Sequence, residues 1–265
     1  MSGSSRKKTL VQWLVDGVVT LVCWLYFLFA FLLFFWICYL AAYLFTADRE
    51  RSFQYLNHCF FKGFLALLRV MAPAHRWKID RRVGEIRGSI IVCNHLSYLD
   101  PLLFLSLLSQ NKTIVKTKFF SAPVFGLLLD ISGYLPSTTE GRFAGMMIER
   151  VEGMGKFFEG GGNLFVFPEG TRNSGASVER LHKGVFKIAR MYQCPVEVLR
   201  ISGTDTLFTP GHFFFNTTCR NRIDLQSITT IQSDPAQGKM TVSTLHQKVR
   251  DAFLQHTGSV EQVVV

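Results

Sequence analysis

The chain has 265 residues, of which 48% are hydrophobic and 14% aromatic, and its formal net charge is +10. This length allows one sizeable domain with an appendage, and the basic charge favours an anionic partner, either nucleic acid or a membrane surface. The aromatic residues gather in an apolar N-terminal segment rather than among the basic residues, which excludes a nucleic-acid binder in favour of a membrane protein.

The apolar N-terminal segment has no Asp, Glu, Lys or Arg from Gly17 to Ala47, a run of 31 residues. As a helix rising about 1.5 Å per residue, this run exceeds a hydrocarbon core of about 30 Å. We therefore expect a membrane helix or helices over residues 10–46. A cleaved signal peptide is the alternative, because Arg6, Lys7 and Lys8 precede the run, but its apolar region would be only about 7–15 residues.

Basic residues flank this segment on both sides, with three before it and six more from Arg49 to Lys78. A single crossing would put one of these clusters on the disfavoured side, whereas a re-entrant hairpin would keep both on the cytosolic face. Both topologies remain open. Residues 53–71 mix apolar and polar side chains, which suits either a helix lying in the membrane interface or an amphipathic core helix.

Downstream of the membrane segment, strand-like and helix-like patterns alternate. We expect strands at 77–79, 88–93, 113–118, 163–167, 195–201 and 222–226, and helices at 101–108, 122–131, 142–159, 184–192 and 241–254. This alternation predicts an α/β fold with a largely parallel mixed sheet flanked by helices. We divide the chain into a membrane-embedded helical part, residues 1–75, and an α/β domain, residues 76–265.

The six cysteines form no C-x-x-C pair and no Cys/His cluster with metal-ligand spacing. Two of the six lie inside the membrane segment. We therefore expect reduced thiols, no metal site and an α/β domain that faces the cytosol.

The first candidate functional motif is N-H-L-S-Y-L-D at residues 94–100, between the buried strand 88–93 and Pro101. His95 and Asp100 are five positions apart, roughly 140° off a common helical face, so they cannot meet on the surface of one helix. They can meet if His95 lies in a loop and Asp100 opens the next helix. The carboxylate would then hold one imidazole nitrogen and leave the other as a general base. A helix-capping Asp100 beside an ordinary loop histidine is the alternative.

The second motif is F-P-E-G-T-R at residues 167–172, directly after the expected strand 163–167. Gly170 permits close backbone approach, Thr171 supplies a hydroxyl, and Arg172 offers a planar fork for a phosphate or carboxylate. Taken alone, the motif also fits a surface turn with a solvated Glu169–Arg172 pair.

The two motifs together, about seventy residues apart, resemble the glycerophospholipid acyltransferase family, best known for 1-acyl-glycerol-3-phosphate (lysophosphatidate) acyltransferases. The resemblance covers roughly residues 76–225. It implies a membrane-bound acyltransferase that moves a fatty acyl group from acyl-CoA or acyl carrier protein to a lysolipid, with phosphatidate as the expected product. It also implies that His95 is the catalytic base, that Asp100 orients it, and that Glu169, Gly170, Thr171 and Arg172 bind the acceptor. No metal or prosthetic cofactor is indicated.

The direct attack of a lysolipid hydroxyl on the thioester needs no covalent enzyme intermediate, and the sequence offers no G-x-S-x-G elbow or Cys-His signature. Ser97 is therefore a candidate for fixing the loop rather than a nucleophile. We expect backbone N–H donors for the oxyanion near Gly170 or at the start of the helix after Asp100. Lys183-Gly184 and Pro195-Val196 match family blocks expected to be structural.

Two positions depart from the family pattern. Thr138-Thr139 stand where the family usually has an Asp-Arg pair that helps to hold the acceptor phosphate, and Arg142 is a possible substitute. The fourth block lacks its second proline. Another acceptor, such as a lyso-aminoacid lipid or a lysophospholipid with a larger head group, therefore stays open, as do a membrane esterase and a catalytically silent membrane adaptor.

Overall fold

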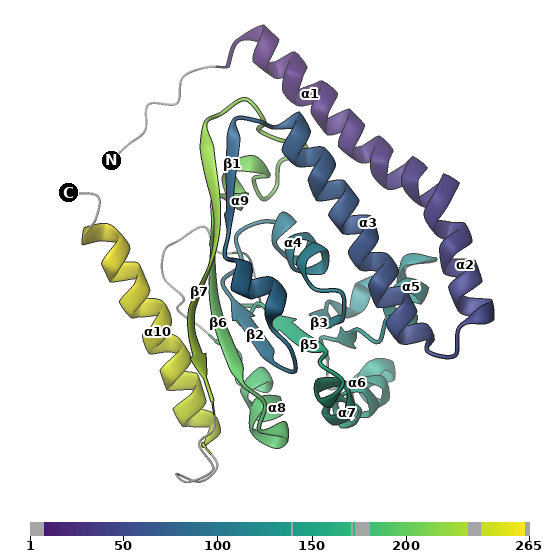
Figure 1. Ribbon diagram of the computed structural model, residues 1–265, viewed down its shortest axis with the longest axis vertical. Helices are drawn as coiled ribbons and strands as arrows, with labels where there is room; N and C mark the ends of the chain where they lie inside the picture. Colours follow the sequence, from purple (N-terminus) through teal and green to yellow (C-terminus); the bar gives the residue numbers. More distant parts are fainter. Residues whose placement is uncertain (1–7, 139, 171, 173–180, 233–239, 263–265) are drawn as a thin grey trace.

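The computed structural model describes residues 8–138, 140–170, 172, 181–232 and 240–262, with side chains up to residue 256. One long N-terminal helix runs along the outside of an α/β domain (Figure 1). It consists of α1 (Leu10–Leu25), a π-helical stretch η1 (Tyr26–Phe35) and α2 (Trp36–Phe45), without interruption. Thr9 begins it with a capping box, because its side chain accepts from the Gln12 N–H while the Gln12 side chain accepts from the Thr9 N–H.

The N-terminal helix distinguishes between a straight segment and a hairpin within the apolar residues. It is continuous over 36 residues, and it is the one helix among the described residues whose length and composition suffice to cross a membrane. No hairpin turn lies within it, so a re-entrant hairpin inside the apolar segment is not what the structure shows. The chain reverses only after Phe45, into α3 (Arg49–Met71). That the segment crosses a bilayer stays a prediction.

Helix α3 buries one face against the domain, as an amphipathic core helix does. Phe64, Leu65 and Leu68 are all at most 2% exposed and belong to the same core cluster as residues of the sheet. Two polar side chains on this face bond to the domain, since the Gln54 amide donates to the Ser132 carbonyl at 2.9 Å and Asn57 donates to the Ser132 hydroxyl at 2.9 Å. The division of the chain at residue 75 stays a prediction, because α3 and the sheet share one core.

The centre of the domain is a seven-stranded sheet in the order β1-β7-β6-β2-β5-β3-β4. Every pair in it is parallel except the antiparallel β6 and β7. The prediction of a largely parallel mixed sheet is therefore confirmed. The strands are β1 (His75–Ile79), β2 (Ile90–Cys93), β3 (Asn111–Val115), β4 (Leu135–Pro136), β5 (Asn163–Val166), β6 (Val196–Ser202) and β7 (Asn221–Ile231).

Helices cover both faces of the sheet, and the core has two halves. Ile91 and Cys93 of β2 face one apolar cluster with α1, α3 and α4, whereas Ile90 and Val92 face the other with α8 and α10. A strand covered on both faces reads as a continuous apolar run, as residues 88–93 do. The other helical elements are η2 (Arg81–Glu85), α4 (Leu99–Leu107), η3 (Thr117–Phe119), α5 (Phe125–Ile131), η4 (Gly141–Phe143), α6 (Ala144–Glu152), α7 (Met154–Glu159), α8 (Gly184–Tyr192), α9 (Thr204–Leu207) and α10 (Val242–Gln262).

Several expected elements differ from the observed ones in extent. The helix expected over residues 142–159 is a short 3₁₀ turn followed by α6 and α7, with a break at Gly153. Strand β7 extends to Ile231, five residues past the expected end at 226, because its residues from Asp224 to Ile231 pair with β6. The short elements β4 and α9 were not expected at all.

Candidate active site

His95 and Asp100 meet at the corner between β2 and α4. Strand β2 ends at Cys93, His95 lies in the following loop, and Asp100 lies in the first turn of α4 just before Pro101. The His95 Nδ1 is 2.9 Å from the Asp100 Oδ2. The predicted strand, loop and helix therefore bring the imidazole and the carboxylate together, as the five-residue spacing required.

The Asp100 carboxylate is fully buried and is held by four donors. Its Oδ2 accepts from the backbone N–H groups of Leu96 at 2.6 Å and Ser97 at 2.8 Å, in addition to His95. Its Oδ1 accepts from the Thr204 hydroxyl at 2.6 Å, across from the end of β6. A buried charge is stable only when it is bonded in this way, so the carboxylate is fixed as the orienting partner of His95.

The proton arrangement on His95 follows from its partner. A carboxylate only accepts, so Nδ1 carries the hydrogen and Nε2 has its lone pair for a substrate proton. The ring stacks on Phe167 with centroids 4.2 Å apart and 18° between the planes. With one nitrogen bonded and one face covered, the imidazole is held in a single orientation, its side chain still 17% exposed.

Two further residues of the first motif fix the loop. The Asn94 amide donates to the Ile201 carbonyl at 2.9 Å and accepts from the Ile201 N–H at 2.8 Å, so its side chain extends the pairing of β2 with β6. The Ser97 hydroxyl donates to the Phe208 carbonyl at 2.6 Å and is fully buried. Ser97 therefore anchors the loop to the chain after α9, in agreement with the expectation that it is not a nucleophile.

The second motif lies at the same edge of the sheet, because β5 is parallel to β2 and beside it. Glu169 follows β5 and lies close enough to the first motif for the His95 backbone N–H to influence its carboxylate. Burial raises the pKa of Glu169 to about 7, the backbone N–H of His95 partly opposes this rise, and the negative charge of Asp100 adds to it. The Glu169 carboxyl group therefore lies within the electrostatic influence of the His–Asp pair.

Gly170 and Arg172 complete this second motif. Gly170 has φ +70°, and a Cβ there would lie 2.8 Å from the His182 Nε2, so only glycine fits the turn. The Arg172 guanidinium lies over the Tyr98 ring, 3.6 Å from its centroid, and its Nη1 is buried without a hydrogen-bond partner among the described residues. An unpartnered donor beside His95's loop suits an anionic ligand. Thr171 lies outside the described residues.

Arg142 is placed apart from these groups in the described contacts. Its guanidinium donates to the Ser121 hydroxyl at 2.6 Å and lies 4.5 Å from the Phe143 ring centroid. Thr138 bonds Glu140 through its hydroxyl, and Thr139 lies outside the described residues. The suggestion that Arg142 takes over phosphate binding therefore stays a prediction, with a structural partner already in place for its side chain.

Several backbone N–H groups around the two motifs are already engaged in hydrogen bonds. The Gly170 N–H donates to the Phe167 carbonyl at 3.1 Å, and the Leu96 and Ser97 N–H groups are spent on Asp100. The Asp100 N–H donates to the Ser97 carbonyl at 3.3 Å. These bonds account for Gly170 and for the turn up to Asp100, so oxyanion donors near Gly170 or at the helix start after Asp100 stay a prediction.

Sequence reasoning missed three residues of this site. Thr204 follows β6, about a hundred positions after Asp100 along the chain, and no local pattern connects the two. Tyr98 and Phe167 are inside the quoted motifs, yet only the structure shows that they support Arg172 and His95. Tyr98 stands two positions before Asp100 and Phe167 two positions before Glu169, and this shared spacing is a signal that could have been used.

Glu169 allows a test by pH. Because its folded pKa lies near 7 against 4.5 for an ordinary glutamate, the fold favours its protonated form. This contribution to stability is complete below about pH 4.5 and is lost as pH rises through about 7. We expect Glu169→Gln to remove this loss.

The measurement is the free energy of unfolding in denaturant for wild type and Glu169→Gln, at about pH 5 and about pH 9. The exposed Glu159→Gln is the matched control and should follow wild type. Parallel pH dependence for wild type and Glu169→Gln would show that Glu169 titrates normally.

The buried Asp100 on His95 Nδ1, with Arg172 at the same edge of the sheet, is an arrangement suited to general-base chemistry on a substrate that carries an anionic group. Residues 76–202 match the protein family described as Acyltransferase. One relative, the chloroplast 1-acyl-sn-glycerol-3-phosphate acyltransferase BAT2 of Brassica napus, is 30% identical over 122 residues, covering 46% of this chain and 35% of the relative.

Other relatives have the same description. The human 1-acyl-sn-glycerol-3-phosphate acyltransferase beta is 26% identical over 176 residues, covering 66% of this chain and 63% of its own. That of Saccharomyces cerevisiae is 27% identical over 170 residues, covering 62% and 54%. The crystal structure of the Thermotoga maritima enzyme PlsC has the same fold, with a TM-score of 0.70 and 18% identity over 94% of this chain and 98% of that one.

The chain is thus similar to the Acyltransferase family over residues 76–202 and to 1-acyl-sn-glycerol-3-phosphate acyltransferases over as much as 66% of its length. It spans between 35% and 63% of the length of the three curated relatives named above.

Proposed function

We propose that this protein transfers a fatty acyl group from a thioester to the free hydroxyl of 1-acyl-sn-glycerol-3-phosphate, giving phosphatidate. The observation that carries the proposal is the buried Asp100 on His95 Nδ1, with Arg172 across the same edge of the sheet. The names of the relatives support the same acceptor.

His95 acts as the general base in this reaction. A lysolipid hydroxyl is too weak an acid to ionise near neutral pH, so Nε2 takes its proton as the oxygen attacks the thioester carbonyl carbon. The C–S bond then breaks, and the proton passes from Nε2 to the departing thiolate. Asp100 stabilises the imidazolium that exists between these two steps, while Phe167 keeps the ring in place.

Arg172 binds the acceptor phosphate. Its guanidinium is held flat against Tyr98, which leaves the N–H edge for an anion, and Nη1 lacks a partner among the described residues. A planar fork of this kind matches phosphate oxygens in a bidentate arrangement. Gly170 keeps the turn free of a side chain at this point. Thr171 is included in the proposed acceptor site as the motif residue between them.

The donor is acyl-CoA or acyl carrier protein, both of which are anionic and suit a chain with a net charge of +10. The thioester is already activated, so the proposed reaction needs no metal or prosthetic group. The long, largely exposed apolar helix α1–α2 indicates a membrane protein. We place the α/β domain on the cytosolic face of that membrane, where basic residues and reduced thiols are expected.

Replacing Arg172 by alanine tests the acceptor assignment. We expect kcat/KM for lysophosphatidate to fall by about 10²-fold, because charge-assisted hydrogen bonds to the phosphate are lost. Arg142→Ala is the matched control, and we expect a much smaller effect because its guanidinium is bonded to Ser121. The measurement is the initial rate of phosphatidate formation against acceptor concentration. A larger fall in kcat/KM for Arg142→Ala than for Arg172→Ala would assign phosphate binding to Arg142 instead.

A second acceptor class has an observation in its favour. Arg142 is bonded to Ser121 and Thr138 to Glu140. Neither side chain therefore replaces, in the described contacts, the arginine with which the family usually binds the acceptor phosphate at this position. A lyso-aminoacid lipid or a lysophospholipid with a larger head group would need less charge there. A panel of lysolipids in the same assay separates the two, since thiol release with only a zwitterionic acceptor would replace lysophosphatidate.

A further inference from the structure

Four aromatic side chains join the N-terminal helix to the chain between α9 and β7. The Phe213 ring stacks on Trp24 with centroids 5.7 Å apart and 10° between the planes, and Phe214 meets Trp13 edge-on at 6.2 Å. All four side chains are between 44% and 62% exposed. Rings that serve only to fill a core are covered, so this cluster presents its apolar surface outward.

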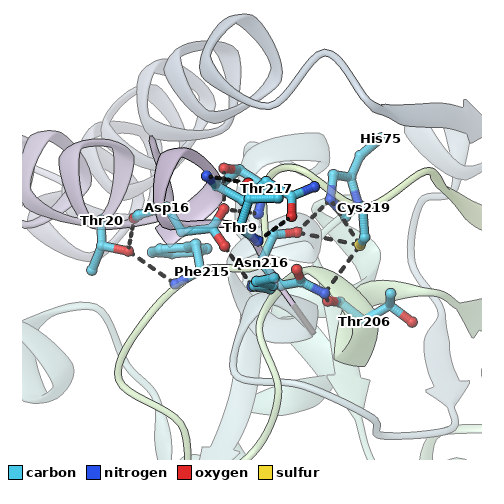
Figure 2. Close-up of polar contacts among 11 residues, drawn as sticks. Thr9, Asp16, Thr20, His75, Thr206, Phe215, Asn216, Thr217 and Cys219 are labelled. Carbon is cyan, nitrogen blue, oxygen red and sulfur yellow. Dashed lines mark hydrogen bonds and ion pairs between the residues drawn. The ribbon is translucent and has the colours of Figure 1, made fainter. Parts of the chain in front are cut away.

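A buried polar anchor holds this arrangement. The Asp16 carboxylate, in the middle of an apolar helix, accepts from the Thr217 N–H at 2.8 Å and hydroxyl at 2.6 Å, and pairs with Lys8 at 2.5 Å (Figure 2). One turn further along α1, the Thr20 hydroxyl accepts from the Phe215 N–H at 2.9 Å. These bonds fix residues 208–217, which we call the aromatic loop, against α1.

The anchor also sets which way α1 faces. Asp16, Thr20 and Cys23 are at most 1% exposed and point toward the domain. The opposite stripe of α1 is apolar and open, with Leu10 76% and Leu14 61% exposed. Trp13 and Trp24 lie between these two sides of α1, and their rings contact those of Phe214 and Phe213. The aromatic loop therefore extends the exposed apolar surface of the helix onto the α/β domain.

The aromatic loop is connected to the candidate active site as well. Phe208, at its start, accepts the hydrogen bond of Ser97 through its carbonyl, and its ring lies 5.9 Å from that of Tyr98, which carries Arg172. The Phe208 ring also stacks on Phe215 at 4.4 Å. The surface that faces outward at Phe213 and Phe214 is therefore linked rigidly to the loop that holds His95.

We propose that the aromatic loop is a second membrane-contacting element, with Phe213 and Phe214 inserted into the interfacial layer of a lipid bilayer beside Trp13 and Trp24. The composition favours lipid over a protein partner. Tryptophan beside phenylalanine, with the Lys8 amine 5.4 Å from the Trp13 ring centroid, is typical of side chains at the boundary of head groups and acyl chains. The surface is also continuous with a 36-residue apolar helix. Lipid contact here sets the catalytic loop at the bilayer surface, where a lysolipid diffuses laterally.

Photolabelling tests this contact without relying on the proposed activity. The full chain is reconstituted in phosphatidylcholine vesicles that contain a lipid with a diazirine on its acyl chain, irradiated, and mapped by mass spectrometry. We expect adducts on residues 212–214 as well as on α1, and none on η2 at the edge of the sheet. Adducts on α1 with an unlabelled aromatic loop would overturn the proposal, and so would crosslinks between two copies through Phe213.

A kinetic comparison, which rests on the proposed acyl transfer, uses the double variant Phe213→Ser/Phe214→Ser. We expect its activity on an acceptor embedded in vesicles to fall about tenfold or more, while activity on a monomeric short-chain acceptor is retained. Met191→Ser is the matched control, since Met191 is 63% exposed on α8, away from this surface. An equal loss on both acceptors would assign the two rings to packing alone and contradict membrane insertion. Absence of wild-type turnover would instead count against the proposed function, leaving the photolabelling to decide this one.

Discussion

Alanine at His95 is expected to lower the rate of acyl transfer by about 10²–10⁴-fold, the range that a positioned general base contributes. The ring is in contact with Phe167 and bonded to Asp100, and its side chain is only partly buried, so its removal costs little packing. The loop stays in place without it, because Asp100 still accepts from the backbone N–H groups of Leu96 and Ser97. The measurement is single-turnover acyl transfer, with the unfolding midpoint measured on the same samples.

The matched control for this variant is His246→Ala. His246 lies on α10 and packs edge-on against Phe186 of α8, with centroids 5.6 Å apart, so it removes an imidazole of similar burial on the other face of the sheet. Its turnover should equal that of wild type. A His95→Ala protein that folds normally and keeps its rate would show that the base lies elsewhere.

The second prediction separates the two roles of Asp100, which are to hold the loop of His95 and to stabilise the imidazolium. Asparagine at this position can keep all four contacts, since its carbonyl oxygen can replace Oδ2 while its NH₂ donates to the Thr204 oxygen, which then accepts. The fold should therefore be nearly as stable as wild type. The negative charge that stabilises the imidazolium is lost, so we expect turnover to fall by at least about 10²-fold.

Alanine at Asp100 should behave differently. It leaves two buried backbone N–H groups, those of Leu96 and Ser97, without an acceptor, at about 1–3 kcal/mol each. We expect Asp100→Ala to lose several kcal/mol of stability as well as activity, whereas Asp100→Asn loses activity alone. The measurements are the free energy of unfolding and turnover of both variants. Equal stability of the two would mean that the carboxylate does not hold the loop.

The geometry of the His–Asp pair was predictable because its causes are local. The apolar run before Asn94, the five-residue spacing and Pro101 together allow only a strand, a loop and a helix start in that order. The second motif was predictable as a strand end for the same reason, and parallel strands bring both ends to one edge. Local chemistry could thus place His95, Asp100 and Glu169 without a structure.

What the sequence could not predict are partners distant along the chain. Thr204 on Asp100, and Thr217 on Asp16, lie more than a hundred residues from the groups they bond. The role of Asn94 depends on β6 lying beside β2, which only the sheet order reveals. The same holds for the N–H groups of Leu96 and Ser97, because no pattern in the sequence shows that the Asp100 carboxylate folds back to accept from them.

The membrane segment shows the same limit. Its length and lack of charge predicted the helix, but the periodicity could not indicate that Asp16 and Thr20 turn inward to the domain. A hairpin was considered only because it would place the basic residues on both sides of the apolar segment on the same face of the membrane. The observed helix is continuous, and its return arm, α3, is part of the core.

The most direct test of the account is acceptor-dependent thiol release by membranes containing this protein, with lysophosphatidate offered beside acyl-CoA or acyl carrier protein and His95→Ala run in parallel. The account predicts thiol release and phosphatidate formation that require lysophosphatidate and disappear in the variant. Thiol release that is absent from folded wild-type protein with every lysolipid and donor offered would contradict it and favour a silent membrane adaptor.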